Sequence, residues 1–490
     1  MSFYRSSMWS IIQMVATQVV ALLTNIILAR ILTPEIFGLL GMATLFTGII
    51  LVIQEVGVGA YLIYKQDTEK TFVSTVFKVN IILSFLLAGI LFSVSAPISD
   101  FYNSSEVEQI IKYISLGVVL GSFGITTRSV FQKEMKFKRI MVIDIISELL
   151  SSVIAVLLAV LGYSILSITT KLLFRPAIQS IGFLLQSNVL ELVNQRFRVN
   201  MVREMISYSS KVLGSQLLIY ISSVADYLVI GKTMGSKELG YYTMAFNWSF
   251  MARSLISNAI GKVVFSDFSR LQNNKEKLTK RYVGVLELLA FILFPICVGF
   301  FCISSDFIKL LYGDKWIESV SLLQILMFAG LISGLGTTTN ALFRSVGRPD
   351  IELKLFSYAF IFIFVLMYTG SYFGLKGVCY AVIIENSIIF FIRSYFVMKI
   401  LGMNMKSYFK CFISSGISSL GMCIVYYLIK ILTIQVTIVQ PISLIIDLFV
   451  LVMSYVLISL KINRKFTLGL LYKIKAVLLP VVNKRKVTTN

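Results

Sequence analysis

The sequence has little charge and no histidine. Only 14% of its 490 residues are charged, and none is histidine, whereas a soluble domain carries about a quarter charged residues. So few charges cannot cover a surface that faces water on every side, which excludes a soluble globular protein. The missing histidine removes the commonest general base and the commonest ligand of transition metals. We therefore expect no metal, no other cofactor and no catalytic residues.

Cysteine is scarce as well and forms no recognisable motif. No two of the cysteines make a CxxC pair, so nothing predicts a redox or zinc site. All lie within or at the ends of apolar stretches, where we expect buried thiols that behave as small apolar groups. They are Cys297, Cys302, Cys379, Cys411 and Cys423.

Apolar residues are abundant and come in long blocks. They make up 57% of the chain, and the runs 73–97, 356–372 and 444–460 are nearly uncharged. About 20 apolar residues span the hydrocarbon core as a helix, whereas a soluble core helix keeps a polar face. Membrane-spanning strands would alternate over about ten residues. The first block, 10–28, has no small-residue cleavage site and is predicted to be a retained helix.

The blocks predict an all-α polytopic membrane protein with fourteen transmembrane helices. Short connections with turn residues separate the predicted spans, as in Thr33-Pro34 and Tyr312-Gly313-Asp314. The expected limits are 9–29, 39–63, 73–97, 109–130, 141–161, 163–187, 208–231, 240–262, 282–303, 318–342, 354–373, 376–398, 408–429 and 439–460.

Lysine and arginine set the orientation. Most of the 45 basic residues fall in segments on the same side of the membrane as the N-terminus. An excess of Lys and Arg marks cytoplasmic loops. Both termini are therefore predicted to be cytoplasmic. The net charge of +21 is then a topology signal, and we expect no nucleic-acid partner because no loop could form a basic domain. The few basic residues expected outside are Arg30, Lys112, Lys232, Lys237, Lys309, Lys315, Lys376 and Lys430.

Two pairs of segments indicate an internal duplication. The stretch from Ala29 to Ala43 matches Gly231 to Ala245 without a gap at an offset of 202, and Gly38 aligns with Gly240. The segment 124–131 matches 336–343 at an offset of 212, where both end the fourth helix of a unit. We predict two pseudo-symmetric six-helix lobes, 1–190 and 200–400. Helices 13 and 14 (405–460) follow, and then a basic cytoplasmic amphipathic tail (461–490) on the anionic inner leaflet.

Charged residues inside predicted spans are the candidate site residues, because charge in lipid is costly and tends to mark function. Asp144 and Glu148 are four apart and share one face of a helix, as do Lys171 and Arg175 on the next one. These two pairs fit either an ion-pair cluster between neighbouring helices or a functional site. Other charges lie near helix ends, from which they can reach the interface: Glu287, Glu385, Arg393 and Asp447.

Glu55, Asp226 and Arg253 form a further candidate set. They lie on the second, seventh and eighth predicted helices. The first and second helices begin the first predicted lobe, and the seventh and eighth begin the second. If the duplication holds, the three residues are placed to line a central cleft. A structural role for them remains the alternative.

The stretch from Leu28 to Asp67 carries a family resemblance. Ala29, Arg30, Leu32, Pro34 and Gly38 form an A-R-x-L-x-P-x-x-x-G turn, and Glu55, Gly57 and Gly59 end the second helix. This pattern resembles the polysaccharide-transporter family of O-antigen and exopolysaccharide flippases. That family belongs to the multidrug/oligosaccharidyl-lipid/polysaccharide exporter superfamily.

The resemblance implies two lobes around a cationic cleft and an undecaprenyl-diphosphate-linked oligosaccharide as substrate, moved to the outer face by alternating access. A diphosphate in a low-dielectric cleft needs basic partners, and we expect Arg253, Lys171, Arg175 and Arg30 to bind it. Protons or sodium are the expected coupling ions. Other expected partners are membrane lipids and the polymerase and chain-length regulator of the pathway. The candidate coupling residues are Glu55, Asp226, Asp144 and Glu148.

Three alternatives stay open. A lipid II flippase would share the mechanism. A drug or cation antiporter of the same superfamily would share the architecture but favour an acidic cleft, against which the basic residues argue. A polytopic sugar polymerase or ligase would be an enzyme, and such enzymes usually need a sizeable external loop, which this sequence does not predict.

Overall fold

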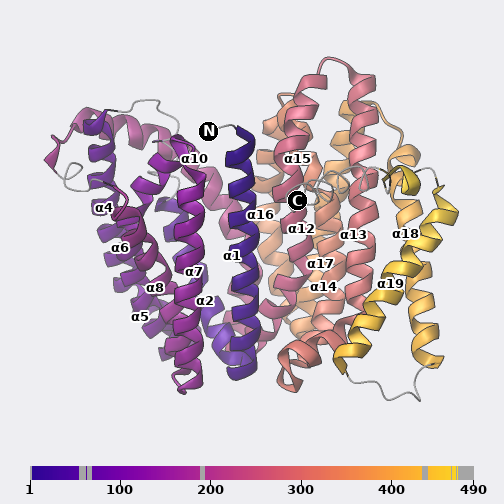
Figure 1. Cartoon of the computed structure of the whole chain (residues 1–490), viewed down its shortest axis with the longest axis horizontal. Helices are drawn as coiled ribbons and strands as arrows, with labels where there is room; N and C mark the ends of the chain where they lie inside the picture. The colour runs from indigo at the N-terminus through magenta and orange to yellow at the C-terminus, as the bar shows by residue number, and fades with distance from the viewer. Residues whose placement is uncertain are drawn as a thin grey trace, which may run out of the picture. The chain divides into compact units, whose positions relative to one another are not determined.

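The computed structural model describes residues 3–54, 62, 69–187, 194–432, 440–464, 466–470 and 472. Throughout these ranges the regular secondary structure is helical, and Figure 1 shows the helices as long rods. The helices are α1 (Phe3–Ile31), α2 (Pro34–Gln54), α4 (Lys70–Ser93), α5 (Ser95–Tyr102), α6 (Ser105–Lys133), α7 (Phe137–Val160), α8 (Ser164–Leu184), α10 (Val199–Ser223), α11 (Ala225–Thr233), α12 (Ser236–Leu271), α13 (Lys275–Tyr312), the 3-10 helix η2 (Asp314–Trp316), α14 (Glu318–Leu335), α15 (Thr337–Ser345), α16 (Pro349–Ser371), α17 (Gly374–Leu401), α18 (Met405–Leu432) and α19 (Gln440–Ile462).

A chain that crosses a lipid bilayer is expected to be helical there, because a helix satisfies its backbone polar groups within one segment. Each of the fourteen predicted spans overlaps a helix. Ten helical segments of the described chain are long and apolar enough to cross a membrane. The other predicted spans coincide with α8, α10 with α11, α12 and α16. In α8, Lys171 and Arg175 interrupt the apolar run. The described residues thus support ten spans, and fourteen remains a prediction.

The basic segment 265–281 lies between the predicted spans 240–262 and 282–303, where a loop would be expected, but it is largely helical. α12 continues to Leu271 and α13 begins at Lys275. Asn274 lies between them and caps α13, since the Lys277 amide donates to its Oδ1 at 3.0 Å. The expectation of a loop was wrong because polarity marks where a chain leaves the lipid, whereas a helix can continue into water.

The chain divides into two compact units, neither of which is continuous in sequence. Unit 1 comprises Met1–Met244, Leu311–Trp316 and Phe356–Val378. Unit 2 comprises Ala245–Leu310, Ile317–Leu355 and Cys379–Asn490. The predicted lobe boundaries, at residues 190 and 400, follow a different division and remain a prediction.

In unit 1, α6 packs on α8, α8 on α7, and α7 on α1. A row of glycines on α6 makes the first of these contacts close. A Cβ built on Gly117 would lie 2.9 Å from the Leu172 carbonyl oxygen, and one on Gly124 would lie 2.9 Å from the Ser180 Cα. Small residues at such spacings let helix backbones approach each other in a membrane. Ser180 Oγ also accepts from the Gly124 amide at 3.0 Å.

In unit 2, α18 and α19 lie side by side (Figure 1). Lys430 joins them to α13 through ion pairs with Asp306 (2.8 Å) and Asp447 (3.0 Å). The start of the predicted tail folds back onto α13, because the Phe466 ring centroid lies 5.8 Å from that of Phe291. The rest of the predicted tail lies largely outside the described residues.

Candidate functional site

The centre of unit 1 holds an ion-pair network built on α7 and α8. Glu148 is fully buried at 0% exposure and accepts two cations, Lys171 Nζ and Arg175 Nη1, each at 2.9 Å. The two predicted pairs therefore meet, with Glu148 of α7 facing both basic residues of α8. Lys171 is nearly buried (14% exposed), whereas the Arg175 side chain is 41% exposed.

Asp144, one turn earlier on α7, gathers groups from three other helices. Its carboxylate pairs with Arg128 Nη2 of α6 at 3.0 Å and accepts from Gln179 Nε2 of α8 at 3.0 Å. Gln13 of α1 also donates to it. A carboxylate that is 2% exposed needs such partners, because an unpaired buried charge is strongly unfavourable. Three basic and two acidic residues thus form the network: Arg128, Lys171, Arg175, Asp144 and Glu148.

Unit 2 contains a second network with the same numbers of basic and acidic residues, including one pair in direct contact. Arg344 of α15 binds Glu352 of α16 through two bonds, Nε to Oε2 at 3.0 Å and Nη2 to Oε1 at 2.9 Å. Arg393 of α17 interacts electrostatically with Glu352, Glu385 and Arg253. Three basic residues again accompany two acidic ones.

The two networks use corresponding helices of the proposed repeats. An arginine near the end of the fourth helix pairs with an acid on the fifth helix in both: Arg128 with Asp144, and Arg344 with Glu352. The sixth helix supplies Lys171 and Arg175 in unit 1 (α8) and Glu385 and Arg393 in unit 2 (α17). Glu148 of α7 and Arg253 of α12 complete the two sets. In unit 2 the Arg393 side chain of the sixth helix also reaches the matching glycine of the fourth. A Cβ built on Gly336 would lie 3.9 Å from Arg393 Nη1, where Gly124 of unit 1 meets Ser180.

Arg253 of α12 is exposed and lies over the ring of Phe250, with the guanidinium carbon 5.7 Å from the ring centroid. It also interacts electrostatically with Glu385 of α17. The structure thus joins this predicted residue to the network of unit 2. Stacking on an aromatic ring leaves the donors of a guanidinium free to bind an anion in plane.

Asp226, at the start of α11, is engaged by neutral groups. Its carboxylate accepts from the Tyr242 hydroxyl and from the Tyr227 amide at 2.9 Å. It is 6% exposed, and it lies apart from the ion pairs described above. Glu55, its predicted companion on the second helix, lies outside the described residues.

Arg30 lies at the end of α1, where one residue at the end of α13 and two residues of η2 bind the last turn. Arg30 Nε donates to the Leu311 carbonyl at 2.8 Å. In return, Lys315 Nζ donates to the Arg30 carbonyl at 2.8 Å and to the Leu32 carbonyl at 2.5 Å. The buried Trp316 donates from Nε1 to the Ala29 carbonyl at 2.9 Å. Partial burial lowers the pKa of Lys315.

The duplicated turns themselves form a reciprocal contact in unit 1. A Cβ built on Gly38 would lie 1.6 Å from the Ser236 carbonyl oxygen, and one on Gly240 would lie 1.9 Å from the Pro34 carbonyl oxygen. Ser236 is the counterpart of Pro34 at the offset of 202, just as Gly240 is the counterpart of Gly38. Each turn thus places its glycine against the residue that corresponds to the one its own glycine's counterpart touches. Such a reciprocal contact has two-fold character. The close approach at Gly38 is therefore mirrored by the one at Gly240.

Several of these residues had no sequence signal of their own. Arg128 lies inside the duplicated segment 124–131, but its counterpart at the offset of 212 is Asn340 rather than Arg344. A search for basic residues within one turn of matched positions would have found both arginines. In the described part of the chain, no three His, Cys, Asp or Glu side chains gather as metal ligands.

The network of unit 1 gives a stability prediction. Glu148→Gln leaves Lys171 and Arg175 without their carboxylate, and breaking a buried pair costs about 3 kcal/mol or more. We expect a clear loss of thermal stability for the purified protein in detergent, partly restored by adding Lys171→Met. Glu108→Gln, which breaks the exposed Lys112–Glu108 pair of α6, is the control and should change stability by less than about 1 kcal/mol. Equal unfolding temperatures for Glu148→Gln and wild type would contradict this assignment.

Comparison with known sequences gives a consistent set of relatives. A family described as "Polysaccharide biosynthesis protein" matches residues 27–321. The lipopolysaccharide biosynthesis protein WzxC of Escherichia coli K12 is 25% identical over 412 residues, 82% of each chain. The succinoglycan biosynthesis transport protein ExoT of Rhizobium meliloti is 25% identical over 344 residues, 70% of this chain and 69% of that protein.

Comparison with solved structures identifies the fold. The lipid II flippase MurJ in an inward closed conformation has a TM-score of 0.76 at 15% identity, covering 93% of this chain and 99% of that one. An inward-facing multidrug resistance MATE family transporter of the MOP superfamily has a TM-score of 0.64 at 17% identity, covering 80% and 98%. The chain is thus an all-helical polytopic membrane protein with the fold of these transporters.

Proposed function

Because this chain belongs to the polysaccharide biosynthesis protein family, we propose that it is a flippase for an undecaprenyl-diphosphate-linked oligosaccharide repeat unit. It is a multi-pass membrane transport protein of polysaccharide biosynthesis and not an enzyme. In the proposed reaction the repeat unit of an O-antigen, capsule or exopolysaccharide moves from the cytoplasmic to the outer face of the bacterial inner membrane. The sugars and diphosphate cross through protein while the lipid tail stays in the bilayer.

The observation that carries the proposal is the charge balance of the two networks. Each contains three basic and two acidic residues within predicted membrane spans or at their ends. Each set thus carries one positive charge more than its acidic residues balance. An excess of cationic donors in a low-dielectric setting suits a diphosphate. A drug or cation antiporter would need the opposite excess.

A lipid II flippase remains the second candidate, because this chain also has the fold of MurJ. Lipid II also carries a diphosphate on an undecaprenyl chain, so the networks suit it equally well. The relatives WzxC and ExoT favour the polysaccharide pathway. We expect a polymerase and a chain-length regulator to act on the product.

We further propose two repeats related by a pseudo-two-fold axis, which alternate in access to the two faces. The reciprocal contact of Gly38 and Gly240 and the matched networks support this arrangement. Arg253, Lys171, Arg175 and Arg30 are the proposed substrate-binding residues. Glu55, Asp226, Asp144 and Glu148 remain proposed carriers of a coupling proton or sodium ion. Asp226 fits that role best among those described, because its partners are neutral hydroxyl and amide groups.

The proposed function is tested by deleting the gene and analysing polysaccharide and lipid-linked intermediates. We expect surface polysaccharide to disappear while undecaprenyl-diphosphate-linked repeat units accumulate on the cytoplasmic face. Restoring the full chain should reverse both effects. Normal polysaccharide together with increased drug sensitivity would favour an antiporter. Lysis on depletion with accumulation of lipid II would favour the second candidate.

The topology gives a separate prediction. With both termini cytoplasmic, the α5–α6 connection faces outward and the α12–α13 connection faces inward. In a chain whose native cysteines are replaced by serine, Ser104→Cys should react with a membrane-impermeant thiol reagent in intact cells. Asn273→Cys should react only after the membrane is opened. The reverse labelling pattern would overturn the orientation.

A further inference from the structure

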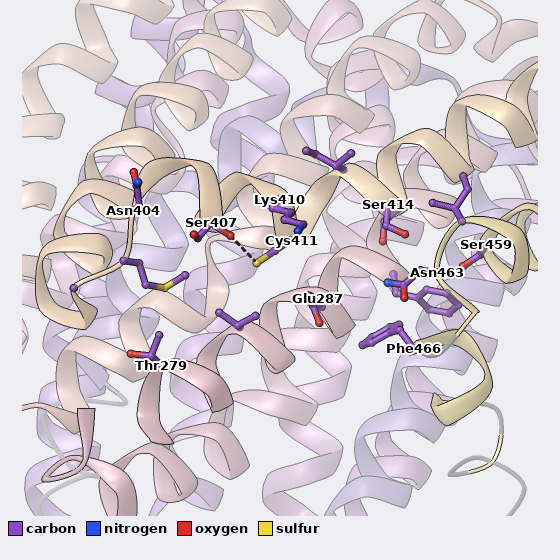
Figure 2. Close-up of a pocket in the computed structure, with 17 residues that line it drawn as sticks. Thr279, Glu287, Asn404, Ser407, Lys410, Cys411, Ser414, Ser459, Asn463 and Phe466 are labelled. Atoms are coloured by element: carbon purple, nitrogen blue, oxygen red, sulfur yellow. Dashed lines mark hydrogen bonds between the residues drawn. The ribbon is translucent and has the colours of Figure 1, made fainter. Parts of the chain in front are cut away.

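Unit 2 contains a cavity of about 900 Å³ with both polar and apolar lining residues, separate from the ion-pair networks. It lies where α13 begins, where α18 begins and where α19 ends. Figure 2 shows Ser407, Lys410 and Ser414 of α18 along one side, with Glu287 of α13 facing them. Asn463 and Phe466 close it at another side. In the proposed topology all three helix ends lie at the cytoplasmic leaflet.

Two opposite charges face this cavity without satisfying each other. Glu287 lies inside the predicted span 282–303 and is half-buried, and Lys410 is exposed at the start of the predicted span 408–429. Throughout the described chain, neither side chain makes an ion pair. A charge at this depth needs a partner or water. The two side chains are thus available for a ligand that carries both an anionic and a cationic group.

The cavity opens toward the lipid-facing side of α18. Ile413 lines it and is 55% exposed. Ile417 (50%), Leu420 (64%) and Ile424 (60%) continue from Ile413 at spacings of four, three and four residues, which places them on one helix face. An apolar stripe that starts at a cavity with charged and hydroxyl groups on its wall matches the shape of a phospholipid, with its head group in the cavity and a chain along the helix.

We propose that this cavity binds the phosphoethanolamine head group of a phospholipid. The ammonium group donates to the Glu287 carboxylate, and the phosphate accepts from Lys410 and the neighbouring serine hydroxyls. An anionic head group would leave Glu287 unpaired. A choline head group has no N–H to donate. A small water-soluble ligand would not use the apolar stripe. The assignment to the cytoplasmic leaflet rests on the proposed topology, but the site does not depend on the transported substrate.

The test compares head groups on the purified full-length protein. Native mass spectrometry in detergent, with added phosphatidylethanolamine, phosphatidylcholine or phosphatidylglycerol of the same acyl chains, measures how much of each lipid is retained. We expect phosphatidylethanolamine to bind roughly tenfold more tightly than phosphatidylcholine, the factor that one charge-assisted hydrogen bond supplies. Free phosphoethanolamine, which lacks the acyl chains, should bind far more weakly.

Variants then assign the preference to the cavity. Glu287→Gln should abolish the preference for ethanolamine over choline, and Lys410→Gln should weaken the binding of every phospholipid. Glu276→Gln on α13 and Lys406→Gln on α18 are the matched controls and should leave both properties unchanged, because neither residue lines the cavity. Equal binding of the two lipids to wild type would overturn the proposal, as would a preference that survives Glu287→Gln.

A lipid series on the wild-type protein keeps the proposal testable if Glu287→Gln does not fold. Successive N-methylation of the ethanolamine removes N–H donors one at a time, so retention should fall stepwise from ethanolamine to choline. An unchanged retention across the series would overturn the assignment of Glu287 to the ammonium group.

Discussion

Gly240→Ala and Gly38→Ala are each expected to reduce polysaccharide export at least about tenfold, which corresponds to 1.4 kcal/mol. A single Cβ at either position would overlap a backbone carbonyl of the facing turn, at 1.9 Å from Pro34 or 1.6 Å from Ser236. Backbone cannot rotate away as a side chain can, so the two turns must separate. Overpacking of this kind typically costs about 1–3 kcal/mol. Surface polysaccharide in a complemented deletion strain is the measurement.

The matched control for these substitutions is Gly89→Ala in α4. A Cβ built there meets nothing within 4 Å, so export should remain normal. Protein amount in the membrane must be measured beside export. If both turn variants are present at normal amount and export normally, the contact is not required to be as close as the structure has it. If they are present but inactive, the contact is needed in the transport cycle.

Arg253→Ala is expected to abolish export while the protein remains in the membrane at normal amount. The guanidinium stacks on Phe250 and adds positive charge near Glu385 and Arg393. If this arginine binds the diphosphate, its removal costs a charge-assisted interaction that no neighbour replaces. Arg253→Lys should keep part of the activity, because it retains the charge and loses the planar donors. Surface polysaccharide is again the measurement.

Arg348→Ala provides the control for Arg253. Arg348 pairs with Asp350 in the exposed α15–α16 turn, Nε to Oδ1 at 2.9 Å, and an exposed pair contributes little. Normal export by Arg253→Ala would remove this residue from the substrate path. Loss of the variant protein from the membrane would instead assign Arg253 a role in folding of unit 2.

The positions of the helices could be predicted from hydropathy, because in lipid an apolar run has to be helical. The ends of the helices could not. α12 and α13 continue well beyond the apolar runs 240–262 and 282–303, since a helix that leaves the lipid gives no hydropathy signal. The break between α4 and α5 at Val94 lies within the single apolar block 73–97, so hydropathy could not predict it.

The candidate site, too, could be predicted only in part. The spacing of Asp144 and Glu148, and of Lys171 and Arg175, predicted that each pair shares a helix face, because the period of a helix fixes that relation. The spacing could not say which carboxylate takes which cation. Both cations of α8 bind Glu148, and Asp144 takes Arg128 from a different helix. Pairing across helices depends on packing, which here depends on the glycines of α6.

The binding of the last turn of α1 by Leu311, Lys315 and Trp316 has a consequence for biogenesis. The carbonyls of Ala29, Arg30 and Leu32 find their donors more than 280 residues later in the chain. During synthesis, the first helix therefore enters the membrane with this end uncapped, and it stays so until residue 316 has emerged from the ribosome. Unit 1 is not complete before residue 378. The first helices therefore reach their complete set of native contacts only after most of the protein has been made.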